Sequence, residues 1–392
     1  MLSMLPPAGN RICLHPWRDT EGDIEGLFNP YRVRLYQSGT AALAAALAAA
    51  VARRPQSRPE VLLPAYACPD LVSAVLYAGA RPVLVDLSAD TPWLDLPELE
   101  AKITGHSVAI IAVNFLGIQE RLASLRAIAD KADILLIEDS AQCLFDPVNG
   151  EGPRGDFIIQ SFGRGKPVSL LQGGAVIYRD ARLADGLPPL DRGRAISMAG
   201  RLSGVLKMLL YNALLTPRAY GLIDALPFLH IGATRFKPLL AMQSAGALVR
   251  SLLPANIDAY RARPSATQER IRSMLEGPGM ACVMDLARGL SSGSRPRLLR
   301  YPLLIADSQL RDALYRRMKK AGLGASRMYP APLPEIAGLG QVIDPGEYPG
   351  AERFARSILT LPTHAGVGVR HIKAMETLIV QSCAGKVPGP GK

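Results

Sequence analysis

Lys166 stands in a loop with glycines on either side, in the segment SFGRGKPVSLLQGGA that spans residues 161–175. Its amine could hold a phosphate, form a Schiff base with an aldehyde, or lie on the surface as a solvated charge. A nucleotide-binding P-loop would need the pattern Gly-x-x-x-x-Gly-Lys-Ser/Thr. Gln160 stands where the first glycine belongs and Pro167 where the hydroxyl belongs, which excludes a P-loop.

Two segments earlier in the chain offer groups that suit an anionic ligand. In YQSGTAAL, Ser38, Gly39 and Thr40 begin an alanine-rich helix, so free backbone amides, two hydroxyls and the positive helix end converge on one point. In IEDSAQ, Asp139 ends an apolar run, and the carboxyl ends of parallel strands collect ligand-binding residues. Taken alone, each segment also fits a plain helix cap.

The three features together match the requirements of pyridoxal phosphate (PLP). The phosphate of this cofactor binds well at a helix N-terminus, its pyridine nitrogen needs a carboxylate, and its aldehyde needs a lysine amine. Lys166 follows Asp139 after about 27 residues, in the next glycine-bearing loop. Lys166 is then the expected Schiff-base residue.

The sequence resembles the sugar aminotransferases of the DegT/DnrJ/EryC1/StrS family, which are fold type I PLP enzymes. The resemblance runs from about Leu35 to the last helix. Four ordered segments carry it: SGTAAL, VLLPAYACPDLVSAVLYAGARPVLVDL, IEDSAQ and the lysine loop. Two later segments, RFKPLLAMQSAGAL and AERFARSILTLPTHAGV, are similar to further family segments.

The resemblance implies a role for each matched residue. Lys166 would bind the cofactor aldehyde and afterwards move a proton between substrate and cofactor. Asp139 would keep the pyridine nitrogen protonated, and Gln142 would lie beside the ring oxygen. The residues implied for cofactor binding are Ser38, Gly39, Thr40, Cys68, Asp139, Gln142, Ser161, Lys166 and Arg235.

The sequence departs from the family pattern at three matched positions. Cys68 stands where the family usually carries an aromatic residue that stacks on the cofactor, so either Tyr66 replaces that residue or the ring packs on a smaller group. Asn114 replaces a frequent histidine, and Thr234 lies near the usual place of an asparagine that reaches across subunits. These departures bear on the substrate more than on the cofactor.

The elements that must position these groups alternate along the first half of the chain. Helices are expected at about 40–53, 70–78 and 120–131, with short apolar, β-branched runs between them. This pattern is typical of an α/β domain with a mostly parallel sheet covered by helices on both faces. The resemblance implies a fold type I PLP-transferase, with a seven-stranded type of sheet and a smaller C-terminal α+β domain.

Three units are expected along the chain. They are an N-terminal segment at 1–34, a large PLP-binding domain at 35–250 with a helical insertion at about 196–236, and a small domain at 251–392. Further helices are expected at 202–215, 238–253, about 308–320 and about 369–382.

The net charge of +11 is concentrated in one part of the sequence. Residues 181–330 carry 23 basic and 9 acidic side chains, whereas residues 1–180 carry 16 and 20. The basic part could face an anionic ligand, nucleic acid or an acidic membrane surface, or be a basic surface without such a role. The family resemblance favours an anionic substrate and no nucleic acid.

Cysteine usage and the start of the chain bear on location. Five cysteines are an odd number without a Cys-x-x-Cys pair, which predicts reduced thiols, no disulfide framework and no zinc site. Cys143 is interpreted as small core filling, and His364 as a packed or capping residue. The first ten residues do not resemble a secretory signal, and the uncharged run 35–52 predicts a buried helix, so a cytoplasmic protein is expected.

The segment 198–236 is longer and more apolar than expected between the family motifs. Leu202, Val205, Leu206, Leu209 and Leu210 share one face at helical spacing. Two interpretations stay open. In the first, the segment is a helical hairpin that packs on the dimer. In the second, it binds the surface of an anionic membrane, where the enzyme would work with a lipid-linked glycan pathway.

The resulting functional hypothesis is an aminotransferase that uses PLP. It would move an amino group from glutamate to a keto-sugar carried by a nucleotide, in a homodimer whose subunits complete each other's sites. One alternative is transamination of another ketone or aldehyde. The other is a non-catalytic, regulatory PLP-binding protein, against which the joint presence of Lys166, Asp139 and Gln142 speaks.

Overall fold

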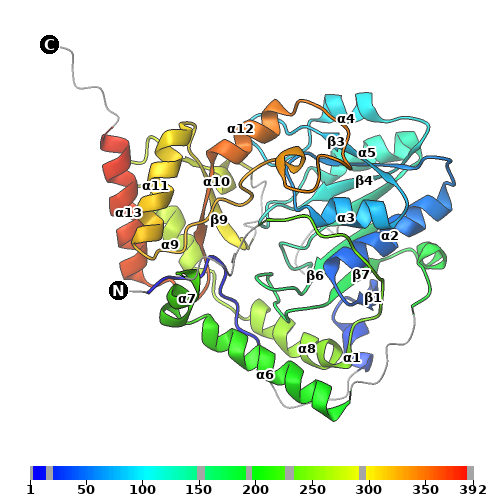
Figure 1. Ribbon diagram of the computed structural model, residues 1–392, viewed down its shortest axis with the longest axis horizontal. Helices are drawn as coiled ribbons and strands as arrows, with labels where there is room; N and C mark the ends of the chain where they lie inside the picture. The colour runs from blue at the N-terminus through cyan, green and yellow to red at the C-terminus, as the bar shows by residue number, and fades with distance from the viewer. Residues whose placement is uncertain are drawn as a thin grey trace.

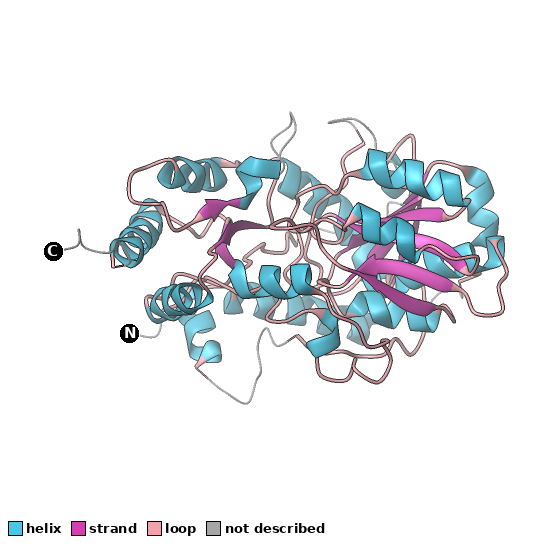
Figure 2. Ribbon diagram, turned by 90° about the horizontal axis from the view of Figure 1, so that it is seen from above, coloured by secondary structure: helices cyan, strands magenta, loops and turns pink. Residues whose placement is uncertain are grey.

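The computed structural model of the 392-residue chain describes residues 3–14, 21–147, 155–190, 197–225, 234–290 and 297–385. A seven-stranded sheet of order β1-β7-β6-β5-β4-β2-β3 forms the centre of its larger part (Figures 1 and 2). Its strands are β1 Arg32–Tyr36, β2 Glu60–Pro64, β3 Arg81–Val85, β4 Ser107–Val113, β5 Leu135–Asp139, β6 Phe157–Ser161 and β7 Gly174–Tyr178. Five neighbouring strands, in the sheet order β6-β5-β4-β2-β3, pair in parallel. Strand β7 runs antiparallel to both of its neighbours, β1 and β6. The predicted mostly parallel sheet is confirmed.

Helices cover both faces of this sheet. α2 (Gly39–Arg53) and α3 (Asp70–Tyr77) share a core with one face, and α4 (Leu96–Lys102) and α5 (Leu122–Ala132) share a core with the other. Because side chains alternate along a strand, β2 contributes to both cores. The apolar run within 35–52 forms the buried α2, as predicted, and in the described part of the chain no helix is long and apolar enough to cross a membrane.

A three-stranded sheet, β10-β9-β8, organises the smaller part of the molecule. Its strands are β8 Met284–Asp285, β9 Arg300–Leu304 and β10 Ile358–Pro362. Its helices are α9 Ala266–Leu275, α10 Leu286–Leu290, α11 Ser308–Lys320, α12 Pro349–Ser357 and α13 Val369–Ala384. Figure 2 shows this part beside the end of the large sheet, so the two parts meet where the strands of the large sheet end.

Helix α8 (Ala247–Arg261) joins the two parts. Leu252, Leu253 and Ile257 pack in the same core as residues of β1 and β7. The boundary expected at residue 250 therefore falls inside a helix that packs on the large sheet as far as Ile257.

The helix expected over 238–253 begins only at Ala247. The residues before it run along the edge of the large sheet, where Ala245 N donates to the Leu35 carbonyl at 3.2 Å and Gln37 N donates to the Gln243 carbonyl at 3.0 Å. The helix prediction was wrong for these residues because the edge strand offers hydrogen bonds that an apolar periodicity does not reveal.

The N-terminal segment, residues 3–14, runs between the two parts. Met4 N donates to the Pro217 carbonyl at 2.8 Å, and Leu5 N donates to the Gly322 carbonyl at 2.8 Å. The expected insertion contains two helices, α6 (Met198–Leu214) and α7 (Pro217–Asp224), and its residues 226–233 lie outside the described part of the chain.

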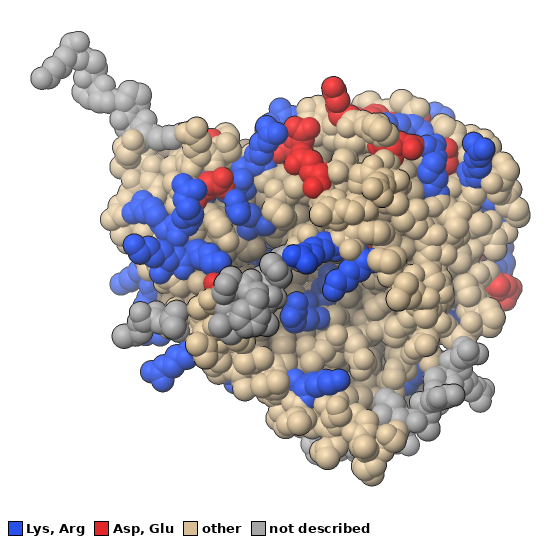
Figure 3. All heavy atoms as spheres, in the orientation of Figure 1, with Lys and Arg blue, Asp and Glu red and all other residues tan. Residues whose placement is uncertain are grey.

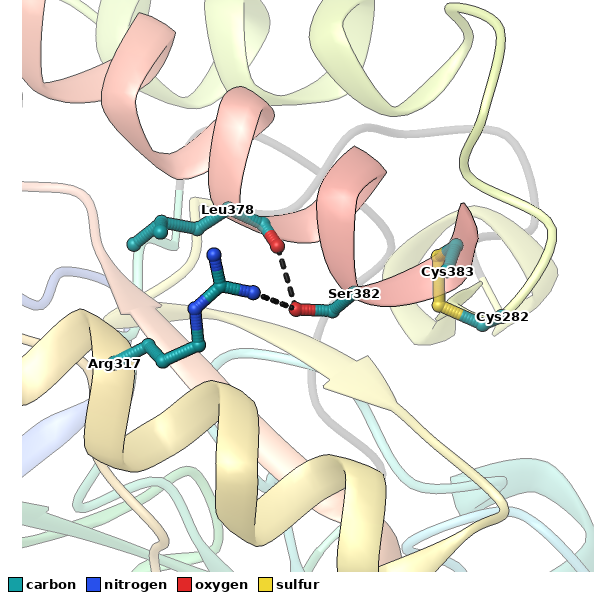
Figure 4. The surroundings of a disulfide bond; sticks show 5 residues. All are labelled: Cys282, Arg317, Leu378, Ser382 and Cys383. Carbon is teal, nitrogen blue, oxygen red and sulfur yellow. Dashed lines mark hydrogen bonds between the residues drawn. A yellow bond between two sulfur atoms is a disulfide. The ribbon is translucent and has the colours of Figure 1, made fainter. Parts of the chain in front are cut away.

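Cys282 and Cys383 form a disulfide bond in the smaller part (Figure 4). The prediction of reduced thiols is wrong for this pair, whereas the other three cysteines are free. The two residues are 101 positions apart, but the packing of α13 brings their Cα atoms to 5.4 Å, within the range of a disulfide. Arg317 of α11 donates to Ser382 Oγ at 2.8 Å beside the bond. Only the tertiary packing reveals this pairing.

Candidate functional site

Asp139 ends β5 at the carboxyl edge of the large sheet, where the sequence predicted it. Its side chain is buried, and Oδ1 accepts a hydrogen bond from Ala141 N at 3.0 Å. Burial raises the pKa of the Asp139 carboxyl, while the ammonium of Lys166 and the amide of Ala141 oppose that rise. The charge of Lys166 therefore acts on Asp139, and the structure brings these two predicted residues together.

The loop that carries Lys166 joins β6 to β7 and is fixed by the N-terminal segment. Gly165 and Gly173 have φ of +76° and +99°, a left-handed conformation that glycine adopts without strain. Asn10 Nδ2 donates to the carbonyls of Lys166 and Pro167 at 3.2 and 2.8 Å. The main chain at the lysine is thus held from outside the loop, by a residue that the motifs did not indicate.

The N-terminus of α2 meets the end of β6. Ser38 is the N-cap of α2, and its Oγ accepts a hydrogen bond from Ala41 N at 3.1 Å. The amides of Gly39 and Thr40 precede the first intrahelical bond, and such amides bind anions well. A methyl group added at Gly39 would lie 2.7 Å from Ser161 Cβ, so only glycine allows this close approach. Ser38 therefore caps the helix, while Gly39, Thr40 and Ser161 form a candidate phosphate cradle.

Gln142 lies next to this set and is held in place at both ends of its amide. Oε1 accepts a hydrogen bond from Leu116 N at 2.8 Å, and Nε2 donates to Tyr329 Oη at 2.9 Å. Burial, and then Cys68 beside it, raise the pKa of Tyr329 well above its usual range, so its hydroxyl stays protonated. Tyr329 comes from the smaller part of the molecule and was not indicated by the sequence, because it lies in an irregular stretch rich in proline and glycine.

Tyr66 does not take the place of the missing aromatic residue. Its ring packs edge to face against Phe115 and Phe354, and its hydroxyl donates to the Tyr329 carbonyl at 3.0 Å. Cys68 is half-buried within electrostatic reach of Lys166, and burial raises the pKa of its thiol to about 12, which keeps it neutral. Of the two alternatives, the structure favours a cofactor ring packed on a smaller group.

Asn114, which replaces a frequent histidine, ties the ends of two strands together. Its Nδ2 donates to Glu138 Oε1 at 2.7 Å and to Ser140 Oγ at 2.9 Å, and its Oδ1 accepts from Glu120 N at 3.0 Å. Burial raises the pKa of Glu138 to about 7, against the effect of the bonds from Asn114 and Ser140. Because the Asn114 amide bonds only groups of its own chain in these contacts, we interpret Asn114 as a residue that stabilises the edge of the sheet.

Arg235 is the predicted site residue that the structure does not bring to this set. It is exposed and follows the half-buried Thr234 in the segment that leads to the edge strand. Its assignment to the site of a second subunit stays a prediction.

The interpretation of His364 and Cys143 as packed residues agrees with their surroundings. His364 is buried, with Nε2 at 2.9 Å from the Pro6 carbonyl and Nδ1 accepting from Gly366 N at 3.1 Å. Burial lowers the pKa of His364 to about 4, so the ring is neutral at pH 7. Cys143 is half-buried against the Ser140 carbonyl, and burial raises the pKa of its thiol to about 12.

Arg300 is a functional candidate that the sequence did not indicate. It begins β9, is half-buried, and has its guanidinium near Tyr220 and Tyr329. Nη1 donates to Ser326 Oγ at 3.0 Å, and the buried Nε has no partner. Burial lowers the pKa of Arg300, and within the described ranges no carboxylate forms an ion pair with it. Nothing in the run RPRLLRYPLLI distinguishes it from the other arginines there.

A cavity of about 430 Å³ lies beside the lysine loop. It is lined by Pro167 and Ser169 of the loop, by the N-terminal segment, and by residues of α8. Arg11 and Arg263 are its cationic residues, and among the described residues no acidic one lines it. Lysine and arginine side chains also surround a hollow at the centre of the face drawn in Figure 3. An anionic ligand suits this surface.

The chain matches a known family over its first half. The model of the DegT/DnrJ/EryC1/StrS aminotransferase family matches residues 33–198. A UDP-N-acetyl-3-dehydro-α-D-glucosamine 3-aminotransferase of Acidithiobacillus ferrooxidans is 35% identical over 127 residues, which are 32% of this chain and 34% of that protein. The match thus spans about a third of the length of that relative.

Solved structures resemble the chain over nearly its whole length. A candidate sugar aminotransferase from Streptococcus pneumoniae, in its PLP form, has a TM-score of 0.71 and 20% identity, covering 98% of this chain and all of that one. Helicobacter pylori PseC, an aminotransferase of pseudoaminic acid biosynthesis, has a TM-score of 0.68 and 16% identity, covering 97% and 100%. These likenesses show the predicted fold, that of fold type I PLP-dependent aminotransferases. Through residues 33–198, the chain is similar to the DegT/DnrJ/EryC1/StrS aminotransferase family.

Proposed function

We propose that the protein is a PLP-dependent aminotransferase that moves an amino group from glutamate to a nucleotide-linked keto-sugar. The observation that carries this proposal is the convergence of Lys166, the buried Asp139 and the helix start at Gly39 on one edge of the sheet. PLP bound there would supply an electron sink for the substrate carbon that loses a proton.

The residues at this edge fit the parts of the cofactor. Asp139 offers a buried negative charge to a protonated ring nitrogen. Such a cation would lower the pKa of the Asp139 carboxyl, which burial raises. Gly39, Thr40 and Ser161 offer two amides and a hydroxyl to a phosphate. The Lys166 amine would hold the cofactor aldehyde and would take up or return the proton at the substrate α-carbon.

Arg300 supports a carboxylate-bearing amino donor. Arg300 is half-buried with its Nε unpartnered, and a substrate carboxylate could form two parallel hydrogen bonds with its guanidinium. Tyr329 links the surroundings of Arg300 to Gln142 and therefore to the edge of the sheet. We assign Arg300 to the α-carboxylate of glutamate.

The basic surroundings of the cavity support a phosphorylated acceptor. Arg11 and Arg263 line the cavity, where the described lining holds no acidic residue, so they would attract the diphosphate of a nucleotide-linked sugar. The relative from Acidithiobacillus ferrooxidans acts, by its name, on a UDP-linked 3-keto-sugar. A similar structure, DesI, was solved with its TDP-sugar product, at a TM-score of 0.70 and 21% identity over 98% of this chain and 94% of that one.

A homodimer completes the proposal. Arg235 is exposed in its own chain, and in a dimer it would supply a planar donor fork to the phosphate of the neighbouring site. Mixing the inactive variants Lys166→Ala and Arg235→Ala tests this arrangement. Partial recovery of activity in mixed dimers is expected, and a fully active monomer would exclude it.

Spectroscopy and product analysis test the function. The purified protein should absorb as a PLP Schiff base, its spectrum should change on addition of glutamate, and an added nucleotide-linked keto-sugar should gain an amino group detectable by mass spectrometry. A PLP spectrum that does not respond to any amino acid would instead indicate the regulatory alternative. A response to glutamate with amination of non-sugar ketones alone would indicate the other alternative.

A further inference from the structure

One face of helix α6 fixes the helix to the body of the protein. Met208 is buried there, and a methyl group added at Gly204 would lie 2.5 Å from Leu248 of α8. Asn212 exchanges two hydrogen bonds of 2.8 Å with the main chain of Ile12. The helix therefore has a defined orientation relative to α8 and to the N-terminal segment.

The opposite face of α6 is apolar and exposed. The sequence predicted that five residues share a face, and the structure turns four of them outward, while Val205 packs against the core. The exposed fractions along this face are Met198 78%, Leu202 70%, Leu206 64%, Leu209 51% and Leu210 56%. These five residues, the α6 stripe, extend along nearly the whole helix, or about 25 Å at 1.5 Å per residue.

The charged residues of α6 and of the sequence on either side of it have a single sign. Residues 192–223 contain five basic residues and no acidic one. Lys207 and Arg218 are exposed among them. The next acidic residue, Asp224, pairs with Lys319 at 3.2 Å. An occupant of this face has to be apolar at its centre and negatively charged around it.

We propose that the α6 stripe binds the surface of an anionic phospholipid bilayer, with α6 lying parallel to that surface. The leucine and methionine side chains enter the boundary between headgroups and acyl chains, and Lys207 and Arg218 contact the lipid phosphates. A second copy of this chain is a poorer occupant, because pairing two α6 helices about a two-fold axis would bring two basic segments together without acidic residues. This inference concerns a different surface from the proposed active site and does not depend on its activity.

Flotation of the full-length protein with lipid vesicles tests the proposal. We expect binding to vesicles of phosphatidylcholine with phosphatidylglycerol at low salt, and weaker binding at about 1 M salt, where the Debye length is about 3 Å. The double substitution Leu206→Ser and Leu209→Ser should weaken the binding roughly tenfold or more, because it removes apolar area from the contact. A wild-type protein that stays unbound at low salt would overturn the proposal.

Two controls separate the bilayer from other occupants. The substitutions Met284→Ser and Val369→Ser also remove exposed apolar side chains, but from the smaller part, and should leave vesicle binding unchanged. Light scattering should give the same mass for the wild type and the Leu206/Leu209 variant. A lower mass for that variant would show that a second copy covers the α6 stripe, and equal vesicle binding by both would show that lipid does not contact it.

Discussion

The carboxyl edge of the large sheet and helix α6 place their side chains in opposite ways. At the edge, the polar groups of Asp139, Gln142 and Asn114 are buried and hydrogen-bonded. On α6, large apolar side chains such as Leu202 and Leu206 face outward. Both arrangements reverse the usual distribution of polar and apolar groups. The comparison suggests that each region is completed by another molecule, a phosphorylated cofactor at the edge and lipid at the helix.

Replacing Asp139 should have the largest effect, and only at the edge. We expect Asp139→Asn to lower kcat about a hundredfold to a thousandfold, since it removes a preorganised charge beside the reacting group. Steady-state kinetics measure this loss, and flotation should show unchanged vesicle binding. The exposed Asp130→Asn is the matched control. A catalytic rate equal to that of the wild type would contradict the role of Asp139.

Replacing Arg300 should affect the half-reaction with glutamate and not the half-reaction with the keto-sugar. Because hydrogen bonds to charged groups contribute about 1.5–3 kcal/mol, Arg300→Gln should raise the KM for glutamate roughly tenfold to a hundredfold and leave the PLP spectrum unchanged. The exposed Arg316→Gln is the control. A raised KM for the sugar alone would move Arg300 to the acceptor side of the site.

Two substitutions on the same helix compare its two faces. Met208→Ala should lower the free energy of unfolding by about 3 kcal/mol, because it leaves a cavity against α8. Leu206→Ala should change that free energy by less than about 0.5 kcal/mol, because its side chain is exposed. Denaturant titrations measure both. Equal losses would mean that the α6 stripe is covered in solution without any lipid.

The last prediction concerns pH. Burial raises the pKa of Glu138 to about 7 from its ordinary 4.5, so between these values the folded protein keeps a proton that the unfolded chain releases. The contribution of Glu138 to stability should therefore fall as pH rises from 4.5 to 7, by at most about 3 kcal/mol, and stay constant above. Glu138→Gln should flatten this part of the pH profile. An unchanged profile would show that Glu138 is ionised throughout.

The sequence predicted the parts of the site that local segments encode. The helix start at Gly39, the strand end at Asp139 and the loop at Lys166 each combine a turn or cap with an apolar run, and their order along the chain follows from the topology of the sheet. The mostly parallel sheet was predictable for the same reason.

The parts that the sequence did not predict depend on contacts between distant segments. Tyr329 bonds Gln142 from the smaller part, Arg300 lies near Tyr329, and neither of the two lies in a motif. The Cys282–Cys383 bond depends on the packing of α13. The apolar spacing on α6 predicted the shared face of its four leucines but wrongly included Val205, and periodicity alone does not show whether such a face points inward or outward.

The most direct test of the central claim is to locate the cofactor on the chain. Borohydride reduction of the purified protein with PLP, followed by digestion and mass spectrometry, fixes any Schiff base as a stable adduct. We expect the peptide that contains Lys166 to carry the pyridoxyl phosphate mass, and Lys166→Ala to carry none. An adduct on another lysine, or an equal yield from the Lys166→Ala variant, would contradict the site described for this protein.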